Sequence, residues 1–291
     1  MSNYAHFHNQ LREALPRLPK TLRNVATYML ECPGDIATLS MRQLAAKSNV
    51  SLANFSRLAK EFGYDTYGEL REIYRERVQQ GNILEYHVRA EHLQKTGERI
   101  GGENIWAEFR DTAQENITSV YNKVDYTQIM AAVEALKPCQ KIYVTGMQAS
   151  RSAATYLAYI GGMTSPQFQL VGRTGGILAD DLTDLSDQDA LIAIAMNPCA
   201  RSTVEIAMIA QERGSTVIGI TDTPASPLAM YSSLLLISPN KSPLFFESYI
   251  GITAIIEMLV GMYTVGQNSS VVDRIEKIEA SRLRLHENWD N

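Results

Sequence analysis

The sequence predicts a multidomain protein, in which an all-α helix-turn-helix domain is followed by a three-layer α/β domain with a parallel sheet. Helical periodicity fills residues 11–77, whereas from residue 141 short runs rich in Ile, Val and Leu alternate with helical stretches. The 291 residues, 45% of them hydrophobic, are enough for two cores. We expect domains over 1–80 and 104–291, joined by a linker over 81–103, where polarity rises and glycines cluster.

The most informative stretch of the first domain is residues 41–60, MRQLAAKSNVSLANFSRLAK, which predicts two short helices joined by a tight turn. Small Ala45 is expected where the helices cross, and Asn49 stands where the turn needs a residue that tolerates positive φ. Ser51 is placed to cap the second helix. The apolar positions expected to lock the pair together are Leu44, Val50, Phe55 and Leu58.

The second of these helices is expected to bind DNA. A recognition helix places its N-terminal residues on base edges and its basic residues on phosphates. The side chains expected to face outward are Ser51, Leu52, Ala53, Asn54, Ser56, Arg57 and Lys60. A plain amphipathic hairpin would show the same pattern. However, residues 1–80 hold 11 Lys and Arg against 8 Asp and Glu (+3), and the rest holds 16 against 24 (−8). A basic first domain followed by an acidic remainder favours contact with DNA phosphates by the first domain alone. The same charge distribution fits membrane binding poorly.

The second domain is expected to begin with helices over 104–124 and 126–136. Strands are expected over 141–146, 190–196, 216–221 and 234–239, with helices over 150–161, 201–213 and 243–266 between or after them. Continuous apolar strands alternating with helices indicate a parallel sheet covered on both faces. The charged helix expected over 271–288 is a candidate to pack at a dimer interface.

Composition excludes several classes of protein. The cysteines at 32, 139 and 199 have no paired spacing, which argues against a disulfide framework and a zinc site. No apolar run is long enough to span a bilayer, and the first residues carry no signal-peptide pattern. We therefore expect a cytoplasmic protein without cofactor or metal and without a membrane partner.

A small-molecule site is expected at the carboxyl ends of the strands, where parallel α/β sheets bind ligands. Three loops meet this description: 144–152, with Gly146 and Ser150; 195–205, with Asn197; and 221–227. Ser202 and Thr203 open the helix after the second loop. Each feature alone also fits a tight turn or a helix cap, but their coincidence at one sheet edge favours a pocket. The guanidinium groups of Arg151 and Arg201 would favour an anionic ligand.

These residues resemble the RpiR family of bacterial transcription regulators. The resemblance covers roughly residues 11–265 and rests on LAAKSNVSLANFSRLAKEFGYDTYGELR, GMQASRSA, ERGSTVIGITDTPASPLAMYSSLLL and PLFFESYIGITAIIEML. It implies a helix-turn-helix joined to a sugar isomerase (SIS) domain that binds phosphosugars.

The two ligand loops depart from the family pattern. Gln148 stands where the first loop usually has its second glycine, while Ser150 is retained. In the second loop, which usually reads Ser-x-Ser-Gly-x-Thr, this chain has Ala195, Asn197, Pro198 and Ala200, so that hydroxyls and an N–H are lost. Arg201, Ser202 and Thr203 could rebuild an anion site one turn further on. Otherwise the pocket takes a different small acid, or nothing.

The leading hypothesis is a transcriptional regulator, by resemblance a repressor, that senses a small anionic, phosphosugar-like metabolite. A homodimer or homotetramer would read double-stranded DNA at an inverted repeat with half-sites about 34 Å apart. One alternative is a sugar-phosphate isomerase, for which Glu205 and Glu247 are the attractive bases because no histidine lies between residues 93 and 285. The other is a regulator whose second domain is only a dimerisation scaffold.

Overall fold

The computed structural model describes residues 3–31, 33–48, 50–79, 86–172, 178–267 and 269–289. The chain divides into two compact units, Met1–Ile83 and Leu84–Asn291. Each unit has a core of its own, so the two are described separately.

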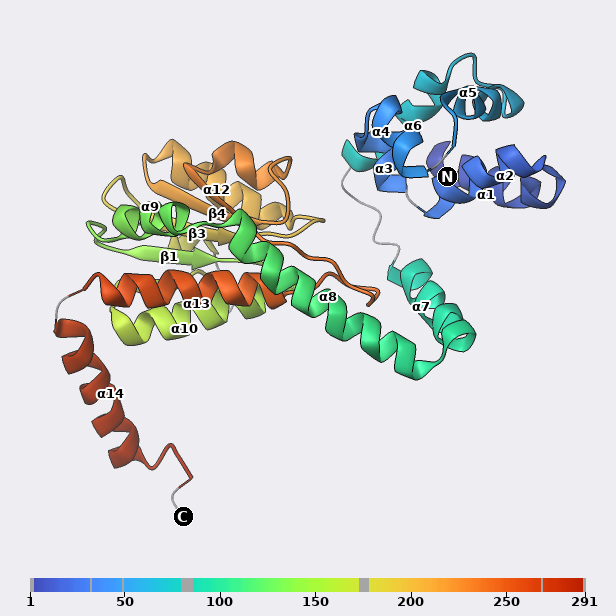
Figure 1. Ribbon diagram of the computed structural model, residues 1–291. Coiled ribbons are helices and arrows are strands. Elements are labelled where there is room, and N and C mark those ends of the chain that lie inside the picture. Colours follow the sequence, from blue (N-terminus) through green and yellow to red (C-terminus); the bar gives the residue numbers. More distant parts are fainter. Residues whose placement is uncertain are drawn as a thin grey trace. The chain divides into compact units, whose positions relative to one another are not determined.

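Among the described residues of the first unit, all regular elements are helices (Figure 1). Its elements are α1 (Asn3–Ala14), η1 (Leu15–Arg17), α2 (Lys20–Glu31), α3 (Pro33–Thr38), α4 (Met41–Ser48), α5 (Leu52–Glu61) and α6 (Tyr67–Gln79). Phe7 is fully buried and meets Phe62, Tyr64 and Tyr74 edge to face at centroid distances of 5.4–6.1 Å. These aromatic contacts join α1 to α6 and to the segment after α5, which stabilises the support behind the helix-turn-helix.

Polar contacts fix the short helices of this unit. The Asp35 carboxylate of α3 accepts hydrogen bonds from the Tyr28 hydroxyl (2.5 Å) and the Lys47 ammonium (3.0 Å), so it links α2, α3 and α4. The Arg71 guanidinium donates to three carbonyl oxygens at the end of α3, those of Ile36, Ala37 and Leu39. These bonds satisfy carbonyls that a helix C-terminus leaves without partners.

The second unit contains a five-stranded parallel sheet in the order β2-β1-β3-β4-β5. The strands are β1 (Ile142–Thr145), β2 (Phe168–Leu170), β3 (Ala190–Ile194), β4 (Thr216–Thr221) and β5 (Leu234–Ile237). The helices are α7 (Tyr86–Ile100), α8 (Gly102–Lys123), α9 (Tyr126–Leu136), α10 (Ser150–Thr164), α11 (Leu178–Asp181), α12 (Arg201–Glu212), η2 (Pro227–Tyr231), α13 (Ile250–Val265) and α14 (Ser270–Leu285).

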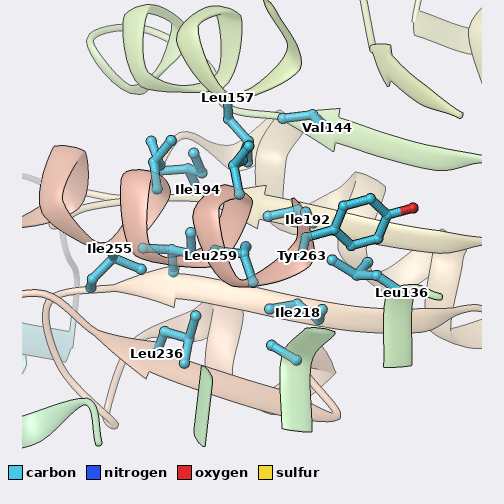
Figure 2. Packing of buried hydrophobic residues seen from close by; sticks show 14 of the residues in the cluster. Leu136, Val144, Leu157, Ile192, Ile194, Ile218, Leu236, Ile255, Leu259 and Tyr263 are labelled. Atoms are coloured by element: carbon cyan, nitrogen blue, oxygen red, sulfur yellow. The ribbon is translucent and has the colours of Figure 1, made fainter. Parts of the chain in front are cut away.

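The sheet is covered on both faces, as the continuous apolar strands predict. Alternate residues of each strand point to opposite faces. Thus Ile192 and Ile218 pack with Leu157 of α10 and with Ile255 and Leu259 of α13 (Figure 2). Helix α12 covers the other face (Figure 1). A second apolar cluster there contains side chains of α12 and η2.

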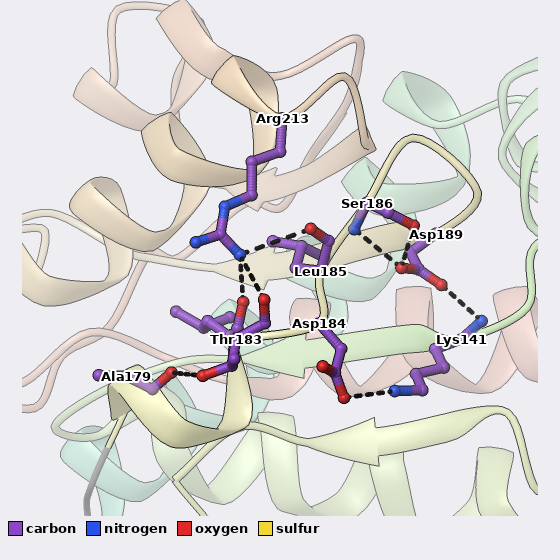
Figure 3. A network of polar contacts seen from close by, with 9 residues as sticks. Lys141, Ala179, Thr183, Asp184, Leu185, Ser186, Asp189 and Arg213 are labelled. Atoms are coloured by element: carbon purple, nitrogen blue, oxygen red, sulfur yellow. Dashed lines mark hydrogen bonds and ion pairs between the residues drawn. The ribbon is translucent and has the colours of Figure 1, made fainter.

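A buried carboxylate connects the loops at the amino-terminal ends of the strands (Figure 3). Asp189, which precedes β3, accepts hydrogen bonds from the Lys141 N–H (3.0 Å) and from the N–H and hydroxyl of Ser186 (both 2.9 Å). Close by, the Arg213 guanidinium donates to the carbonyl oxygens of Leu182, Thr183 and Leu185. Hydrogen bonds within the chain therefore fix the loops at the amino-terminal ends of the strands.

The structure corrects three sequence expectations. The expected linker, 81–103, contains α7, because an amphipathic helix continues through its polar residues up to Ile100. A fifth strand, β2, was missed since three residues are too few to show a period. The helix expected over 243–266 begins only at Ile250, and residues 243–249 are non-helical.

Among the described residues, no single helix is long and apolar enough to cross a membrane, although α13 and α14 reach that length and composition together as a bent pair.

Candidate functional site

The helix-turn-helix consists of α4 and α5. A reciprocal capping box begins α4: the Ser40 N–H donates to the Gln43 side-chain oxygen (3.0 Å), and the Gln43 N–H donates to the Ser40 hydroxyl oxygen (3.4 Å). The S-x-x-Q spacing is a recognised helix-start signal in the sequence. Asn49, expected to take a positive φ, lies outside the described residues.

Helix α5 has one buried and one exposed face. Phe55, Leu58 and Ala59 are fully buried in the core of the first unit. The expected DNA-reading residues Ser51, Leu52, Ala53, Ser56, Arg57 and Lys60 are exposed, and Asn54 is half-buried. Ser51 does occupy the N-cap position, with φ −66° and ψ 145°, but among the described residues its hydroxyl accepts no capping hydrogen bond. Its main-chain oxygen instead accepts from the Asn54 N–H (3.0 Å). The geometry thus leaves short side chains and then basic ones along one accessible helix face.

In the second unit, a small hollow lies at the carboxyl edge of the sheet, where the loop after β1, the loop after β3 and the segment before α13 meet. Its cavity volume is about 20 Å³, about enough for one water molecule. It is lined by Tyr86, Met147, Gln148, Ala149, Ser150, Met196, Asn197, Pro198, Ala200, Phe246, Glu247 and Tyr249. A larger hollow of about 780 Å³ lies between the end of α10 and α14. The smaller one is the better candidate because it lies where parallel sheets bind ligands.

The loop after β1 is held close to α10. A Cβ on Gly146 would lie 2.7 Å from the Ser150 carbonyl oxygen, so only glycine fits there. Gln148 has a φ of +54°, a left-handed conformation that glycine adopts at lower cost. Ser150, expected at the start of a helix as a ligand-binding residue, is the first residue of α10, and its buried hydroxyl is 3.0 Å from the Tyr249 hydroxyl.

Aromatic rings and an ion pair close the hollow. Tyr86, the first residue of α7, has its ring centroid 4.9 Å from that of Phe246, which in turn stacks on Tyr249 at 6.3 Å. The Arg89 guanidinium lies 2.5 Å from the Glu247 carboxylate and donates to the Leu244 carbonyl oxygen (3.2 Å). The first turn of α7 therefore sits against the segment that forms one wall.

A second carboxylate lies directly behind the loop after β3. Asp222 accepts hydrogen bonds from the Asn197 N–H (3.3 Å), the Thr221 hydroxyl (3.3 Å) and the Asn240 side-chain amide (3.2 Å). Desolvation by burial raises the pKa of Asp222, and the nearby Glu247 carboxylate adds to this. Burial likewise raises the pKa of the Tyr249 hydroxyl.

Only some of the residues expected to bind the ligand line the hollow. Gln148, Ser150 and Asn197 line it. Arg151 does not, because its guanidinium donates to the carbonyl oxygens of Val171 and Gly172 after β2. Arg201 is exposed and pairs with Glu205 at 2.6 Å.

The helix-start residues of α12 also lie outside the lining. The buried Thr203 hydroxyl accepts from the Met147 N–H (3.2 Å), which ties α12 to the loop after β1, and Ser202 is half-buried. Tyr86, Arg89, Asp222, Phe246 and Tyr249 lie in or next to the hollow and were not among the residues predicted from the sequence. The FFESY run and the Asp directly after β4 are the signals that could have revealed three of them, Phe246, Tyr249 and Asp222.

Comparison with known proteins identifies both units. The model of the rpiR-family helix-turn-helix domain matches residues 5–81, and that of the SIS domain matches residues 135–262. The HTH-type transcriptional regulator HexR of Pseudomonas aeruginosa is 26% identical over 235 residues, 79% of this chain and 78% of HexR. An HTH-type transcriptional regulator of Thermotoga maritima is 25% identical over 284 residues, 96% of this chain and 97% of that protein.

Two solved structures share the fold. Vibrio vulnificus NanR complexed with ManNAc-6P has a TM-score of 0.59 at 20% identity and covers 97% of this chain and 99% of its own. The sugar isomerase domain of an RpiR transcription factor from Sphaerobacter thermophilus has a TM-score of 0.57 at 22% identity, covering 60% of this chain and 97% of its own. With an rpiR-family helix-turn-helix domain followed by a SIS domain, the chain belongs to the RpiR family of transcriptional regulators.

Proposed function

We propose that this regulator is a cytoplasmic repressor that binds an inverted-repeat operator as a homodimer or homotetramer and responds to a small sugar-derived metabolite. The observation that carries the proposal is α5, whose exposed face presents short side chains and then Arg57 and Lys60, while its other face is fully buried. One such helix reads only a few base pairs, so two-fold related copies are needed to recognise an operator.

The hollow around Ser150 supports the sensing role, since three loops converge there and NanR, which shares the fold, was solved with a sugar phosphate. The expectation of an anionic effector depended on Arg151 and Arg201, and neither lines the hollow. Ligand binding there would change operator affinity by favouring one arrangement of the two units over another.

The two carboxylates considered for isomerase chemistry are both ion-paired, Glu205 with Arg201 and Glu247 with Arg89. A general base must lie within hydrogen-bond reach of the substrate proton, and these ion pairs direct both carboxylates toward arginine side chains instead. This favours a sensor over an enzyme.

The test is titration of a labelled DNA fragment from upstream of the gene encoding this chain, at two salt concentrations and with unlabelled competitor. Tight binding that resists competitor is expected, and site selection should return an inverted repeat. Weak binding that collapses with salt and competitor on every fragment tried would contradict the proposal.

A further inference from the structure

Helix α14 carries an apolar stripe that becomes exposed toward the end of the helix. Val271, Ile275, Ile278 and Leu285 recur at spacings of three, four and seven residues, which places them on one face. Val271 is 4% exposed, Ile275 and Ile278 are half-buried, and Leu285 is 66% exposed. Trp289, four residues beyond Leu285, is 93% exposed. Two large apolar side chains exposed at the end of one stripe mark this end as a surface for a partner.

The stripe also forms part of the wall of the large hollow between α14 and the end of α10, which has a volume of about 780 Å³. Two arginines connect the helices beside this hollow. The Arg274 guanidinium donates to the Gly162 carbonyl oxygen (2.9 Å). The Arg282 guanidinium donates to the Tyr159 hydroxyl (2.7 Å). The hollow is therefore a groove beside an apolar helix face, and a groove of this kind accepts a second helix.

The lining of the groove suits a protein surface better than a small ion. Pro166, Ile278 and Leu285 contribute apolar surface, and charged side chains of both signs, such as Asp273 and Lys277, complete the lining. Protein–protein contacts combine an apolar core with a polar rim in this way. A lining with both signs of charge does not favour an ion of either sign.

The charges of α14 suit a second copy of the same helix. All three acidic residues of α14 lie within its first ten positions, 270–279, whereas its last four positions contain two arginines and no acidic residue. Two antiparallel copies would place each basic end beside the acidic residues of the other copy. Parallel copies would place the two basic ends together, where they repel. An antiparallel pair has two-fold symmetry, so both copies use the same patch.

We infer that α14 is a dimerisation helix. The stripes of two copies pair antiparallel about a two-fold axis near Ile278, the midpoint between Val271 and Leu285, and Leu285 and Trp289 of each copy enter the groove of the other. This inference depends on the homodimer or homotetramer proposed above, to which it assigns one interface.

The test measures the mass of the intact chain by size-exclusion chromatography with light scattering over a series of concentrations. Leu285→Glu is expected to halve the mass of the assembly, or to raise its dissociation constant at least tenfold. Leu283→Glu is the matched control, because Leu283 is 68% exposed and lies two positions away, on the opposite side of the helix. Both side chains are exposed in the single chain, so both variants should unfold at the temperature of the unaltered chain.

Cysteine cross-linking tests the direction of the pair. Ile278→Cys is expected to form an intermolecular disulfide under mild oxidation, because equivalent residues meet near the axis. Ser270→Cys should cross-link no more than the unaltered chain, since eight residues on either side of the axis separate the two positions by about 24 Å along the helices. Equal cross-linking of both variants would indicate a parallel pair and contradict the arrangement inferred here.

The outcomes distinguish this interface from the proposed assembly itself. If the unaltered chain assembles but Leu285→Glu leaves its mass unchanged, or if Leu283→Glu disrupts it equally, the inference is overturned and the homodimer or homotetramer forms through another surface. A monomeric unaltered chain at every concentration would contradict the proposed assembly, and the inference with it.

Discussion

The hydroxyl of Ser150 lies 3.0 Å from the hydroxyl of Tyr249, and this bond joins two residues 99 positions apart in the sequence. Ser150 begins α10, and Tyr249 immediately precedes α13. Both helices pack on the same face of the sheet (Figure 1). The contact therefore sets the position of one wall of the hollow relative to the loop after β1.

Tyr249→Phe is expected to lower the free energy of unfolding by about 1 kcal/mol, because it leaves the buried Ser150 hydroxyl without this partner. Urea unfolding of the intact chain measures the change. Tyr126→Phe is the matched control, since Tyr126 is 70% exposed and its loss should cost less than about 0.5 kcal/mol. Equal effects of the two substitutions would contradict the structural role of the bond.

Gly146→Ala is expected to destabilise the second unit by about 1 to 3 kcal/mol, since the new Cβ would collide with main-chain atoms of α10. Gly162→Ala, within α10, is the control: nothing lies within 4 Å of its Cβ position, so it should stabilise by about 0.5 to 1 kcal/mol. Thermal unfolding of both variants measures whether each substitution lowers or raises the stability. A stabilising Gly146→Ala would mean that the loop after β1 does not approach α10 as described.

Gln148→Gly is expected to raise the free energy of unfolding by up to about 1 kcal/mol, because it relieves the left-handed backbone at φ +54°. Gln188→Gly, at an exposed position without positive φ, should have no stabilising effect. Urea unfolding compares the two. If Gln148→Gly proved the more destabilising, the Gln148 side chain would contribute more than the strain costs.

Arg57→Ala and Lys60→Ala are each expected to weaken operator binding and to reduce the slope of log K against log salt by about 0.9. Changes at Ser51, Leu52 or Ala53 should instead alter which sequence is preferred. Lys95→Ala, an exposed lysine of α7 in the second unit, is the control and should leave the slope unchanged. Identical behaviour of the basic and the N-terminal sets would contradict the orientation assigned to α5.

Asp35→Asn is expected to destabilise the first unit near pH 7 by about 1 to 2 kcal/mol. Burial opposes ionisation of Asp35, but hydrogen bonds from Tyr28 and Lys47 outweigh it and hold its pKa below the usual value. The stabilisation is thus fully present above about pH 4 and is lost as the pH falls through the lowered pKa. Urea unfolding at pH 7 and pH 3 measures this: the variant and the unaltered chain should differ less in their free energy of unfolding at pH 3 than at pH 7.

The control for this pH dependence is Asp65→Asn, at an exposed aspartate of the same unit. It should show little difference at either pH. A difference for Asp35→Asn that grew as the pH fell would reverse the assigned sign.

Local pattern and chain order were sufficient to predict most of the architecture. The helix expected over 126–136 and the strand expected over 216–221 have the observed bounds of α9 and β4. Both are strongly patterned segments, and α9 also begins with a capping box of Asp125 and Gln128. Because parallel strands place their carboxyl ends at one edge, the meeting of the loops after β1 and β3 also follows from the sequence.

The tertiary structure alone decided which side chains enter the hollow. Arg151 and Arg201 stand at helix starts, as expected, yet one binds carbonyl oxygens some twenty residues away and the other extends into solvent. Tyr86 lies about sixty residues before Ser150 and reaches the site only because α7 packs next to the segment before α13. Local periodicity and strand order thus determine the fold class, the helix-turn-helix and the edge of the sheet at which a ligand is expected, and all three can be predicted from the sequence. The composition and charge of the site depend on contacts between residues far apart in the chain, and no local pattern encodes them.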